Sequence, residues 1–499
     1  MTPTVIGLGV LILGIWLLYK GDILALLCAM LALGLMEGSA AIILPAIGGS
    51  SIPPDRIMLG FLAVASLNRI KVHSELGKDA IVENSWLILF CVYGVISAFF
   101  LPRIFQGQID VVPLRPTGLR SLFDVFPLTF SSQNITTAVY LIGSGLAAIF
   151  SYIAIRRAND LTPLVNIAIA ITLGHAAIGI MGVVLRGTPW DLVVDFFRNG
   201  SYSQLSQETS SFIRISGIMP EPSSYAGFGI VWMIFSFELW LRNIKSLWTG
   251  TAAAVLGLTL ILSTSSTAYL GIAGYAAVLL ARFAMAPSYL RTDKILLLAG
   301  AAFTSVILLF AAMIFSNEFA KEFQTMLLQM TIEKGDSNSG QQRSFWALQG
   351  LEAFKISYGL GIGAGSFRSS SIATAILGCM GAIGIICFSA YLLKLLRTIH
   401  MSGNIEEPSS VALALTSAAG WSALVGLFPA LFTQASPDPG MQFSIFAGIA
   451  IALKHRLITG RFQSQSANFT NQQVMQYAPD DRTKVPTSGS PSGWRHVSK

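Results

Sequence analysis

The segment from Asn134 to Leu185 reads NITTAVYLIGSGLAAIFSYIAIRRANDLTPLVNIAIAITLGHAAIGIMGVVL, two long apolar runs joined by a short basic loop. A helix needs roughly 20 mostly apolar residues to cross a bilayer, and each run is about that long. Helices and closed barrels are the structures that satisfy their own backbone hydrogen bonds inside lipid. The segment therefore predicts two antiparallel membrane-spanning helices.

Runs of the same kind fill most of the chain. Of its 499 residues, 53% are hydrophobic and 11% are charged, whereas a water-soluble protein carries about 25% charged residues. The runs lie near residues 4–19, 22–46, 55–70, 84–102, 134–155, 162–185, 223–241, 247–264, 266–285, 294–315, 372–396, 411–432 and 440–456. The predicted fold class is all-α, a polytopic transmembrane helix bundle of about 12 to 13 spans. Glu37 and the glycines around it favour a break or a re-entry in the second run.

Lysine and arginine residues orient the bundle, because short cytoplasmic loops are rich in both. They recur at every second junction between runs, at residues 69–78, 156–157, 242–245, 282–294, 394–397 and 454–456. These junctions are predicted to face the cytoplasm. The outward face then receives three long connections, at residues 103–133, 186–222 and 316–371.

The two ends of the chain complete the predicted organisation. Residues 1–20 lack the basic region and the cleavage site of a signal peptide, so we expect them to remain as a span. Residues 1–456 are therefore predicted to form one membrane domain. Residues 457–499 are rich in Ser, Gln, Asn and Pro and cannot bury a core, so we expect a disordered cytoplasmic tail.

The outer loop at 186–222 combines an amphipathic stretch with a charged pair. Residues 190–198 mix charged and apolar side chains, which predicts a short helix in the membrane interface. Further on, Arg214 and Glu221 are separated by Gly217 and Pro220, so a cation and a carboxylate meet backbone-bending residues just before a span. The alternative interpretation is that Arg214 reaches lipid phosphate while Glu221 caps the following helix.

The outer loop at 316–371 contains three different stretches. The apolar side chains of residues 319–330 recur at helical spacing, which predicts a second interfacial helix. A hydrophilic linker, GDSNSGQQ, follows at residues 335–342 and is expected to supply mobility. Arg343 then stands at the head of a predicted helix that contains Trp346.

A glycine array ends this loop, with glycine at positions 359, 361, 363 and 365. Alternate glycines let backbone N–H groups approach a ligand closely, and the N-terminus of the next helix favours an anion. The alternative is a re-entry turn that packs tightly against helices. No strand-turn-helix unit surrounds the array, so it is a weak dinucleotide fingerprint.

Motifs of several enzyme classes are missing from the outer loops. The sequence contains no DxD pair there for a nucleotide-sugar metal ion, and no HExxH, GxSxG or P-loop. We therefore expect neither a metal nor a cofactor. The net charge of +7 follows from basic residues at the inner face, and nothing in it indicates nucleic acid.

The two charged motifs resemble the O-antigen polymerase and ligase superfamily, the Wzy-like membrane glycosyltransferases. The first is RISGIMPEPSSYAGF, from Arg214 to Phe228, and the second is RSFWALQGLEAF followed by GLGIGAGSF, from Arg343 to Phe367. The resemblance extends in topology over most of the chain, but its motifs occupy only the two outer loops. It implies a GT-C-like fold in a bacterial inner membrane, with an active site that faces the periplasm.

The resemblance also implies an activity and its partners. A polymerase of this kind moves a growing glycan from undecaprenyl diphosphate to a hydroxyl group of an incoming lipid-linked repeat unit, without a nucleotide sugar or a metal. Its partners are undecaprenyl-diphosphate-linked oligosaccharides, the surrounding membrane lipids and a chain-length regulator of the polysaccharide machinery.

Within that reaction the matching residues take definite roles. Arg214 and Arg343 would bind the donor diphosphate, assisted by Arg368, because a guanidinium pairs with phosphate oxygens and remains charged. Glu221 would be the general base that takes the acceptor proton. The glycines expected to shape the sugar path are Gly361, Gly363 and Gly365.

One departure and two rival classes limit this interpretation. Many ligases of the superfamily carry a histidine shortly after the glycine array, where this chain has Ser369, Ser370 and Ser371. That departure favours a polymerase over an O-antigen ligase. The rivals are a lipid-linked oligosaccharide transporter or flippase, for which ionisable residues near the bilayer midplane in repeated halves are typical, and a non-catalytic scaffold.

Overall fold

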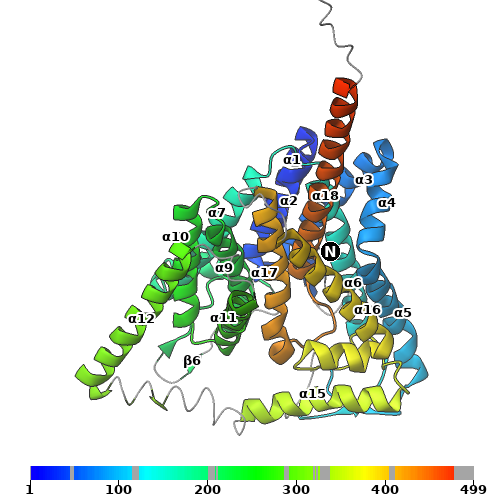
Figure 1. Ribbon diagram of the computed structural model, residues 1–499. Coiled ribbons are helices and arrows are strands. Elements are labelled where there is room, and N and C mark those ends of the chain that lie inside the picture. The colour runs from blue at the N-terminus through cyan, green and yellow to red at the C-terminus, as the bar shows by residue number, and fades with distance from the viewer. Residues whose placement is uncertain are drawn as a thin grey trace, which may run out of the picture. The chain divides into compact units, whose positions relative to one another are not determined.

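The structure is a computed structural model of the whole chain. It describes residues 2–44, 50–114, 123–200, 208–209, 212–285, 292–318, 321, 324–325, 338–403 and 411–476. These residues form an all-α fold with three small antiparallel sheets (Figure 1). The chain divides into two compact units, Met1–His455 and Arg456–Lys499. The first unit contains the helix bundle.

The N-terminal part contains short helices and a three-stranded sheet. Its elements are β1 (Thr2–Pro3), α1 (Val5–Lys20), α2 (Ile23–Leu33), the 3-10 helix η1 (Gly34–Met36), β2 (Ile42–Leu44), β3 (Ser50–Ile52) and α3 (Pro54–Val72). The sheet order is β1-β2-β3. The break expected near Glu37 is present, because α2 ends at Leu33 and the chain continues as a 3-10 turn and then as a strand.

Contacts from the connection between α7 (Thr162–Val184) and α9 (Pro222–Leu241) hold the chain just after this break. The Ser39 hydroxyl donates to the carbonyl of Phe197 at 2.5 Å, and the Ala40 N–H donates to the side chain of Asn199 at 2.7 Å. A side chain at Gly38 would lie 2.1 Å from the carbonyl oxygen of Ile218. Glycine is therefore required where the two segments meet, and the segment that carries Glu37 is fixed against the segment that precedes Glu221.

The next part of the bundle alternates long helices with short connections. Its elements are α4 (Ser74–Glu83), α5 (Ser85–Ile104), β4 (Asp110–Val111), β5 (Phe126–Pro127), α6 (Ser132–Arg156) and α7 (Thr162–Val184). A capping box starts α6, in which Ser131 and Asn134 satisfy each other's backbone N–H groups. Pro163 lies in the first turn of α7, where its fixed φ suits a helix start.

The middle of the chain contributes the most buried helix. Its elements are α8 (Asp191–Phe197), β6 (Glu208–Thr209), β7 (Phe212–Ile213), α9 (Pro222–Leu241), α10 (Ser246–Leu262), α11 (Ser266–Met285) and α12 (Thr292–Phe315). The short helix predicted at 190–198 is present as α8. The predicted interfacial helix at 319–330 lies mostly outside the described residues.

The C-terminal part corrects one expectation. Its helices are α15 (Asn338–Ile356), α16 (Ile372–Gly403), α17 (Val411–Thr433) and α18 (Met441–Gln476). The expected mobile linker at 335–342 is wrong from Asn338 onward, because those residues form the first turns of α15. Helix α18 continues past its apolar part to Gln476, and the disordered tail expected at 457–499 stays a prediction.

Hydropathy and helix length confirm a polytopic helical membrane protein. Among the described residues, eight helices are long and apolar enough to cross a membrane, namely α5, α6, α7, α9, α11, α16, α17 and α18. Three shorter helices, α1, α2 and α10, are also apolar.

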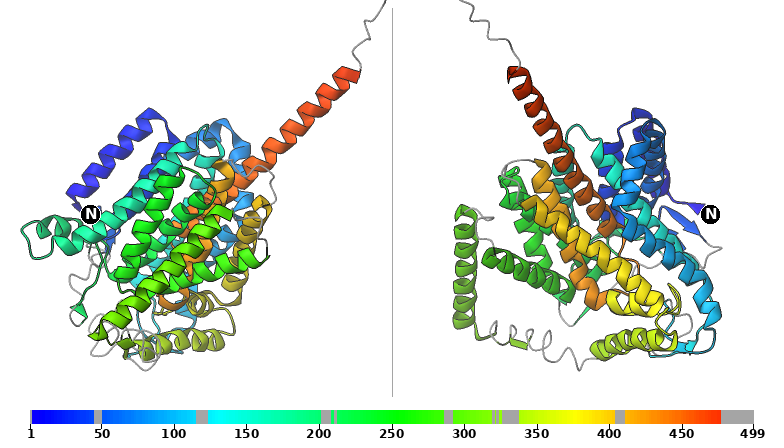
Figure 2. Two further views of the ribbon diagram at one scale, coloured as in Figure 1. Left: turned by 60° about the vertical axis from the view of Figure 1, so that its left-hand side comes forward. Right: turned by 45° about the vertical axis from the view of Figure 1, so that its right-hand side comes forward.

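Basic residues mark one end of the bundle. They occupy the last turn of α3 with Arg69 and Lys71, of α6 with Arg156 and of α11 with Arg282. We call this the basic end. The opposite end carries the connections that contain α8 and α15, and we call it the loop end; α15 lies across it (Figures 1 and 2).

Helix α9 lies at the centre of the bundle. It packs against α7, α10, α11 and α17, and 83% of its apolar window is buried, the largest share among the eight spans. Its fully buried Glu238 forms an ion pair with Arg282 of α11. The same carboxylate accepts hydrogen bonds from Tyr275 at 2.8 Å and from Ser417 at 2.9 Å. Glu238 thus joins α9, α11 and α17 in one satisfied polar network.

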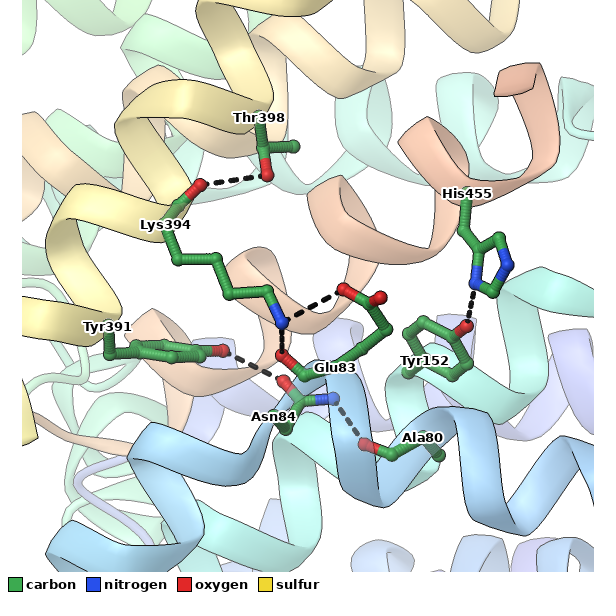
Figure 3. Close-up of polar contacts among 8 residues, drawn as sticks. All are labelled: Ala80, Glu83, Asn84, Tyr152, Tyr391, Lys394, Thr398 and His455. Atoms are coloured by element: carbon green, nitrogen blue, oxygen red, sulfur yellow. Dashed lines mark hydrogen bonds and ion pairs between the residues drawn. The ribbon is translucent and has the colours of Figure 1, made fainter. Parts of the chain in front are cut away.

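A second polar network joins α4, α5 and α16 (Figure 3). Lys394 of α16 forms an ion pair with Glu83 at 2.9 Å and donates to its carbonyl oxygen at 2.6 Å. The Tyr391 hydroxyl donates to the side chain of Asn84 at 2.9 Å, at the residue that separates α4 from α5. These contacts hold the bend between the two helices against α16.

Candidate functional site

A cavity of about 350 Å³ lies at the loop end of the bundle, where α2 and α17 end and α3, α9, α11 and α18 begin. Its charged lining consists of Glu37, Asp55, Arg56 and Glu221. Deeper in the bundle the wall becomes aromatic and apolar, with Trp232 as its largest side chain. The cavity is therefore polar and acidic towards its mouth and apolar towards the bundle core.

Helix starts surround this cavity. The first turns of α3, α9, α11 and α18 contribute Asp55, Ser223, Thr267 and Gln442 to its wall. Each helix N-terminus presents unpaired N–H groups and a partial positive charge, which stabilises a nearby anion by roughly 0.3–1 kcal/mol. The converging helix starts therefore offset part of the repulsion among the carboxylates.

Glu37 lies in the acidic part of this wall. It lies just beyond the last helical residue of η1, and although its side chain reaches the cavity, protein surrounds it closely. This desolvation, with repulsion from Asp55 and Glu221, outweighs the attraction of Arg56 and raises the pKa of Glu37 to about 7.

Beside the cavity, arginines from separate segments gather near Glu221. Burial lowers the pKa of Arg214 below its ordinary value, with Glu221 opposing and Arg343 reinforcing that shift. The pKa of Arg368 is lowered by burial too, again with Glu221 opposing and Arg343 reinforcing. Arg214 and Arg368 thus each lie close enough to Glu221 and to Arg343 to interact electrostatically with both, and we call these four residues the arginine cluster.

Local contacts position two members of the arginine cluster. Arg214 donates to the carbonyl oxygen of Thr264, in the turn between α10 and α11, at 3.5 Å. The guanidinium carbon of Arg368 lies 4.6 Å from the ring centroid of Trp346 on α15, a cation–π contact. Its Nε is buried without a hydrogen-bond partner in the described part of the chain. A guanidinium held by a ring keeps its N–H groups available for a ligand.

The alternative interpretation of Glu221, as a cap of the following helix, agrees with its position but not with its hydrogen bonds. It is the N-cap residue of α9, but its side chain makes no capping hydrogen bond. Its carboxylate instead accepts from the Ser223 hydroxyl. Because Glu221 also lines the cavity, it is the residue shared by the cavity and the arginine cluster.

The glycine array packs against neighbouring helices. An added Cβ at Gly361 would lie 2.5 Å from the backbone of Cys379, at Gly363 2.6 Å from Pro102, and at Gly365 2.5 Å from the carbonyl oxygen of Gln133. All three glycines have positive φ, and the N–H groups of Gly361 and Gly363 already donate within the protein. Packing alone accounts for glycine here, and the expected contact with sugar stays a prediction.

Replacing Gly363 with alanine should destabilise the protein by more than the roughly 1–3 kcal/mol that left-handed strain alone costs. The new methyl group would collide with Pro102 of α5. Thermal unfolding in detergent measures the effect. Gly107→Ala is the matched control, because Gly107 has φ 70° but no atom within 4 Å of an added Cβ. Equal melting temperatures for the two variants would contradict the packing explanation.

The sequence analysis missed Asp55 and Arg56 and read Glu37 only as a helix breaker. A carboxylate inside an apolar run indicates a functional residue by itself, and Glu37 is such a carboxylate. Asp55 and Arg56 follow a proline pair at a helix start, a pattern too common to single them out. Their proximity to Glu221 depends on packing between distant segments.

His175, the histidine inside a predicted span, has a structural environment. Its ring stacks on Tyr225 with centroids 4.0 Å apart, and its Nε2 lies 2.9 Å from the Tyr225 carbonyl oxygen. Both residues are buried between α7 and α9. These contacts place His175 in helix packing, away from the arginine cluster.

No protein-family model matches this chain, and the search of curated proteins found no match. The chemistry of the site therefore rests on its own geometry. The arginine cluster offers planar, permanently charged donors suited to phosphate oxygens. The cavity offers carboxylates suited to proton transfer. Glu221 lies where these two chemistries meet.

Proposed function

We propose that this protein is a polysaccharide polymerase, a membrane glycosyltransferase that needs no metal. It would transfer a growing glycan from undecaprenyl diphosphate to an incoming lipid-linked repeat unit. One observation carries the proposal: Arg214 and Arg368, from two loops far apart in sequence, each interact electrostatically with Glu221 and with Arg343. These residues belong to the motifs that resemble the O-antigen polymerase and ligase superfamily.

The reaction uses the arginine cluster to stabilise the leaving group. The acceptor hydroxyl oxygen bonds to the anomeric carbon of the donor sugar as the bond from that carbon to the phosphate oxygen breaks. The electron pair stays on the diphosphate, which remains attached to undecaprenol. Preorganised guanidinium groups stabilise this developing charge, an effect of about 10²–10³ in rate for each donor. A carboxylate takes the hydroxyl proton, and Glu221 is the base that the sequence analysis predicts.

In this proposal the bundle lies in a bacterial inner membrane with about 12 to 13 spans and a GT-C-like arrangement. Its basic end faces the cytoplasm and its loop end faces the periplasm, where lipid-linked repeat units are presented. The partners are undecaprenyl-diphosphate-linked oligosaccharides, membrane lipids and a chain-length regulator. The serines at 369–371, in place of the ligase histidine, keep polymerase ahead of ligase.

The proposal predicts which lipid-linked products accumulate when the gene is deleted. A strain without the protein should accumulate single repeat units on undecaprenyl diphosphate, because each unit is made but not joined. Mass spectrometry of the extracted lipids measures this. Long unattached glycans on the same lipid would indicate a ligase instead, and wild-type amounts of polymer would contradict both activities.

A purified reaction extends the same test. The protein in detergent should convert the extracted single units into longer lipid-linked glycans, and it should do so equally well with a chelator present. Arginine supplies the positive charge that a metal supplies in other glycosyltransferases, so removing divalent cations should leave the rate unchanged. Loss of product in the chelator would contradict the proposed mechanism.

A further inference from the structure

The side chain of Arg368 is held by an aromatic ring. Its guanidinium carbon lies 4.6 Å from the ring centroid of Trp346 on α15. In the described part of the chain, no hydrogen bond or ion pair joins this guanidinium to another residue. A ring face attracts a cation through its quadrupole, and indole attracts it most strongly. The direction of the Arg368 guanidinium is therefore set by the Trp346 ring and not by a protein acceptor.

The ring of Trp346 is itself fixed by packing. Trp346 is 8% exposed and shares the buried face of α15 with Gln349 and Ala353, which are 4% and 0% exposed. Spacings of three and four residues place these side chains on one face of the helix. The main packing partner of α15 is α16, and an added Cβ at Gly350 would lie 2.4 Å from the carbonyl oxygen of Thr374 in α16. A ring packed in this way holds a cation in one direction.

A backbone bridge sets the distance between this helix and Arg368. The N–H of Arg368 donates to the Val112 carbonyl oxygen at 2.9 Å. The N–H of Val112 in turn donates to the side-chain oxygen of Gln349 at 3.1 Å. Val112 is 1% exposed, so both bonds are shielded from water. The connection between α5 and α6, to which Val112 belongs, therefore joins the helix that carries the ring to the segment that carries Arg368.

A second contact joins the segment of Arg368 to the first part of α15. The Ser370 hydroxyl donates to the carbonyl oxygen of Arg343 at 2.6 Å, and Ser370 is buried. Arg343 lies three residues before Trp346 on the same helix. Arg343, Trp346 and Arg368 therefore belong to one frame, which is built from α15, the connection between α5 and α6, and the segment before α16.

We propose that Trp346 is a positioning residue, whose ring directs the Arg368 guanidinium towards the donor diphosphate. This inference rests on the proposed function, in which Arg368 assists Arg214 and Arg343. Trp346 acts through Arg368 and does not touch the reacting atoms. The electrostatic interaction of Arg368 with Glu221 and Arg343 supports this role, because it places the guanidinium that the ring directs among the groups that the reaction uses.

The test measures kcat/KM of the purified reaction, with single repeat units extracted from the deletion strain as substrate. Trp346→Leu should lower kcat/KM about 2- to 30-fold, the range that the loss of a cation–π contact produces. Trp346→Phe keeps a ring face and should recover most of that loss. Phe345→Leu is the matched control on the same helix, because Phe345 packs against Phe123 with ring centroids 5.6 Å apart. It should match the wild type.

A double-mutant cycle separates positioning from general packing. Arg368→Ala should lower kcat/KM about 10²–10³-fold, the effect of removing one preorganised donor. In the Arg368→Ala background, Trp346→Leu should cause no further loss, because the ring then has no guanidinium to direct. The same fold loss in both backgrounds would show that Trp346 acts independently of Arg368, and it would overturn the proposal.

The outcomes also separate this inference from the function on which it rests. A wild-type protein that makes no polymer overturns the proposed function and the positioning role with it. An active wild type together with a Trp346→Leu variant of equal kcat/KM overturns the positioning role alone. Thermal unfolding in detergent identifies a variant that fails to fold. If Trp346→Leu does so, Trp346→Phe in the same cycle supplies the test, because its smaller loss should also vanish in the Arg368→Ala background.

Discussion

Replacing Arg343 with alanine should abolish polymer formation while the protein still inserts into the membrane in normal amounts. Arg343 lies in α15 and interacts electrostatically with Arg214 and Arg368. Removing one preorganised donor to a developing negative charge costs about 10²–10³ in rate. Polymer length in cells, seen as the ladder of glycan sizes on a gel, measures the effect. Arg214→Ala should give the same result.

A lysine replacement makes the Arg343 prediction more specific. Lysine keeps the positive charge but loses the planar fork that pairs with two phosphate oxygens. Arg343→Lys should therefore remain strongly impaired. A fully active lysine variant would leave Arg343 with a bulk charge effect only, and normal polymer lengths in Arg343→Ala or Arg214→Ala would refute the arginine assignment.

The control for these variants is another arginine at the loop end of the bundle. Arg103 lies at the loop end of α5, is exposed and stacks on Phe130 with 3.6 Å from its guanidinium carbon to the ring centroid. It takes no part in the arginine cluster. Arg103→Ala should therefore leave polymer length unchanged, which separates a local effect from a general loss of positive charge at this end of the bundle.

The largest effect on stability is expected at Glu238. Its carboxylate is fully buried and receives contacts from Arg282, Tyr275 and Ser417. Glu238→Ala would leave the Arg282 guanidinium largely buried without its counter-charge, and breaking such a pair costs about 3–5 kcal/mol. The free cysteines report unfolding, because Cys91, Cys379 and Cys387 are buried and would react with a thiol dye only as the bundle opens.

The second ion pair provides the comparison for Glu238. Glu83 and Lys394 keep 30% and 26% of their side chains exposed, so solvent screens their attraction and the pair contributes about 0–1 kcal/mol. Glu83→Ala should therefore shift the unfolding temperature much less than Glu238→Ala. Similar shifts in the two variants would show that burial does not govern the strength of these networks.

Hydropathy predicted most of the bundle because lipid imposes a simple rule on sequence. Spans such as 134–155 and 162–185 need apolar residues along their whole length, and the structure forms α6 and α7 there. The rule fails where an apolar segment packs against protein instead of lipid. Residues 42–44 are as apolar as a span, yet they form β2, paired between β1 and β3.

Only part of the candidate site could be predicted from the sequence. Arg214, Glu221 and Arg343 stand out because charge is rare in this chain and clusters in two loops. Asp55 and Arg56 share the cavity with Glu221 only because α3 and α9 begin at the same end of the bundle, a consequence of topology. The sequence shows that the glycine array constrains the backbone. It does not show which neighbour requires glycine there, for example Pro102 of α5.

Glu221 and Arg343 are held by helices that differ in their packing. Glu221 opens α9, a helix without a break that is also tied at Glu238 to α11 and α17. Arg343 instead belongs to α15, whose main packing partner is α16, and α16 bends at Gly381 with φ 61°. Glu221 is therefore fixed by a continuous helix tied to two neighbours, whereas the position of Arg343 depends on the bend in α16. Under the proposed function, the angle that Gly381 gives α16 therefore sets the spacing between the proposed base and the proposed diphosphate site.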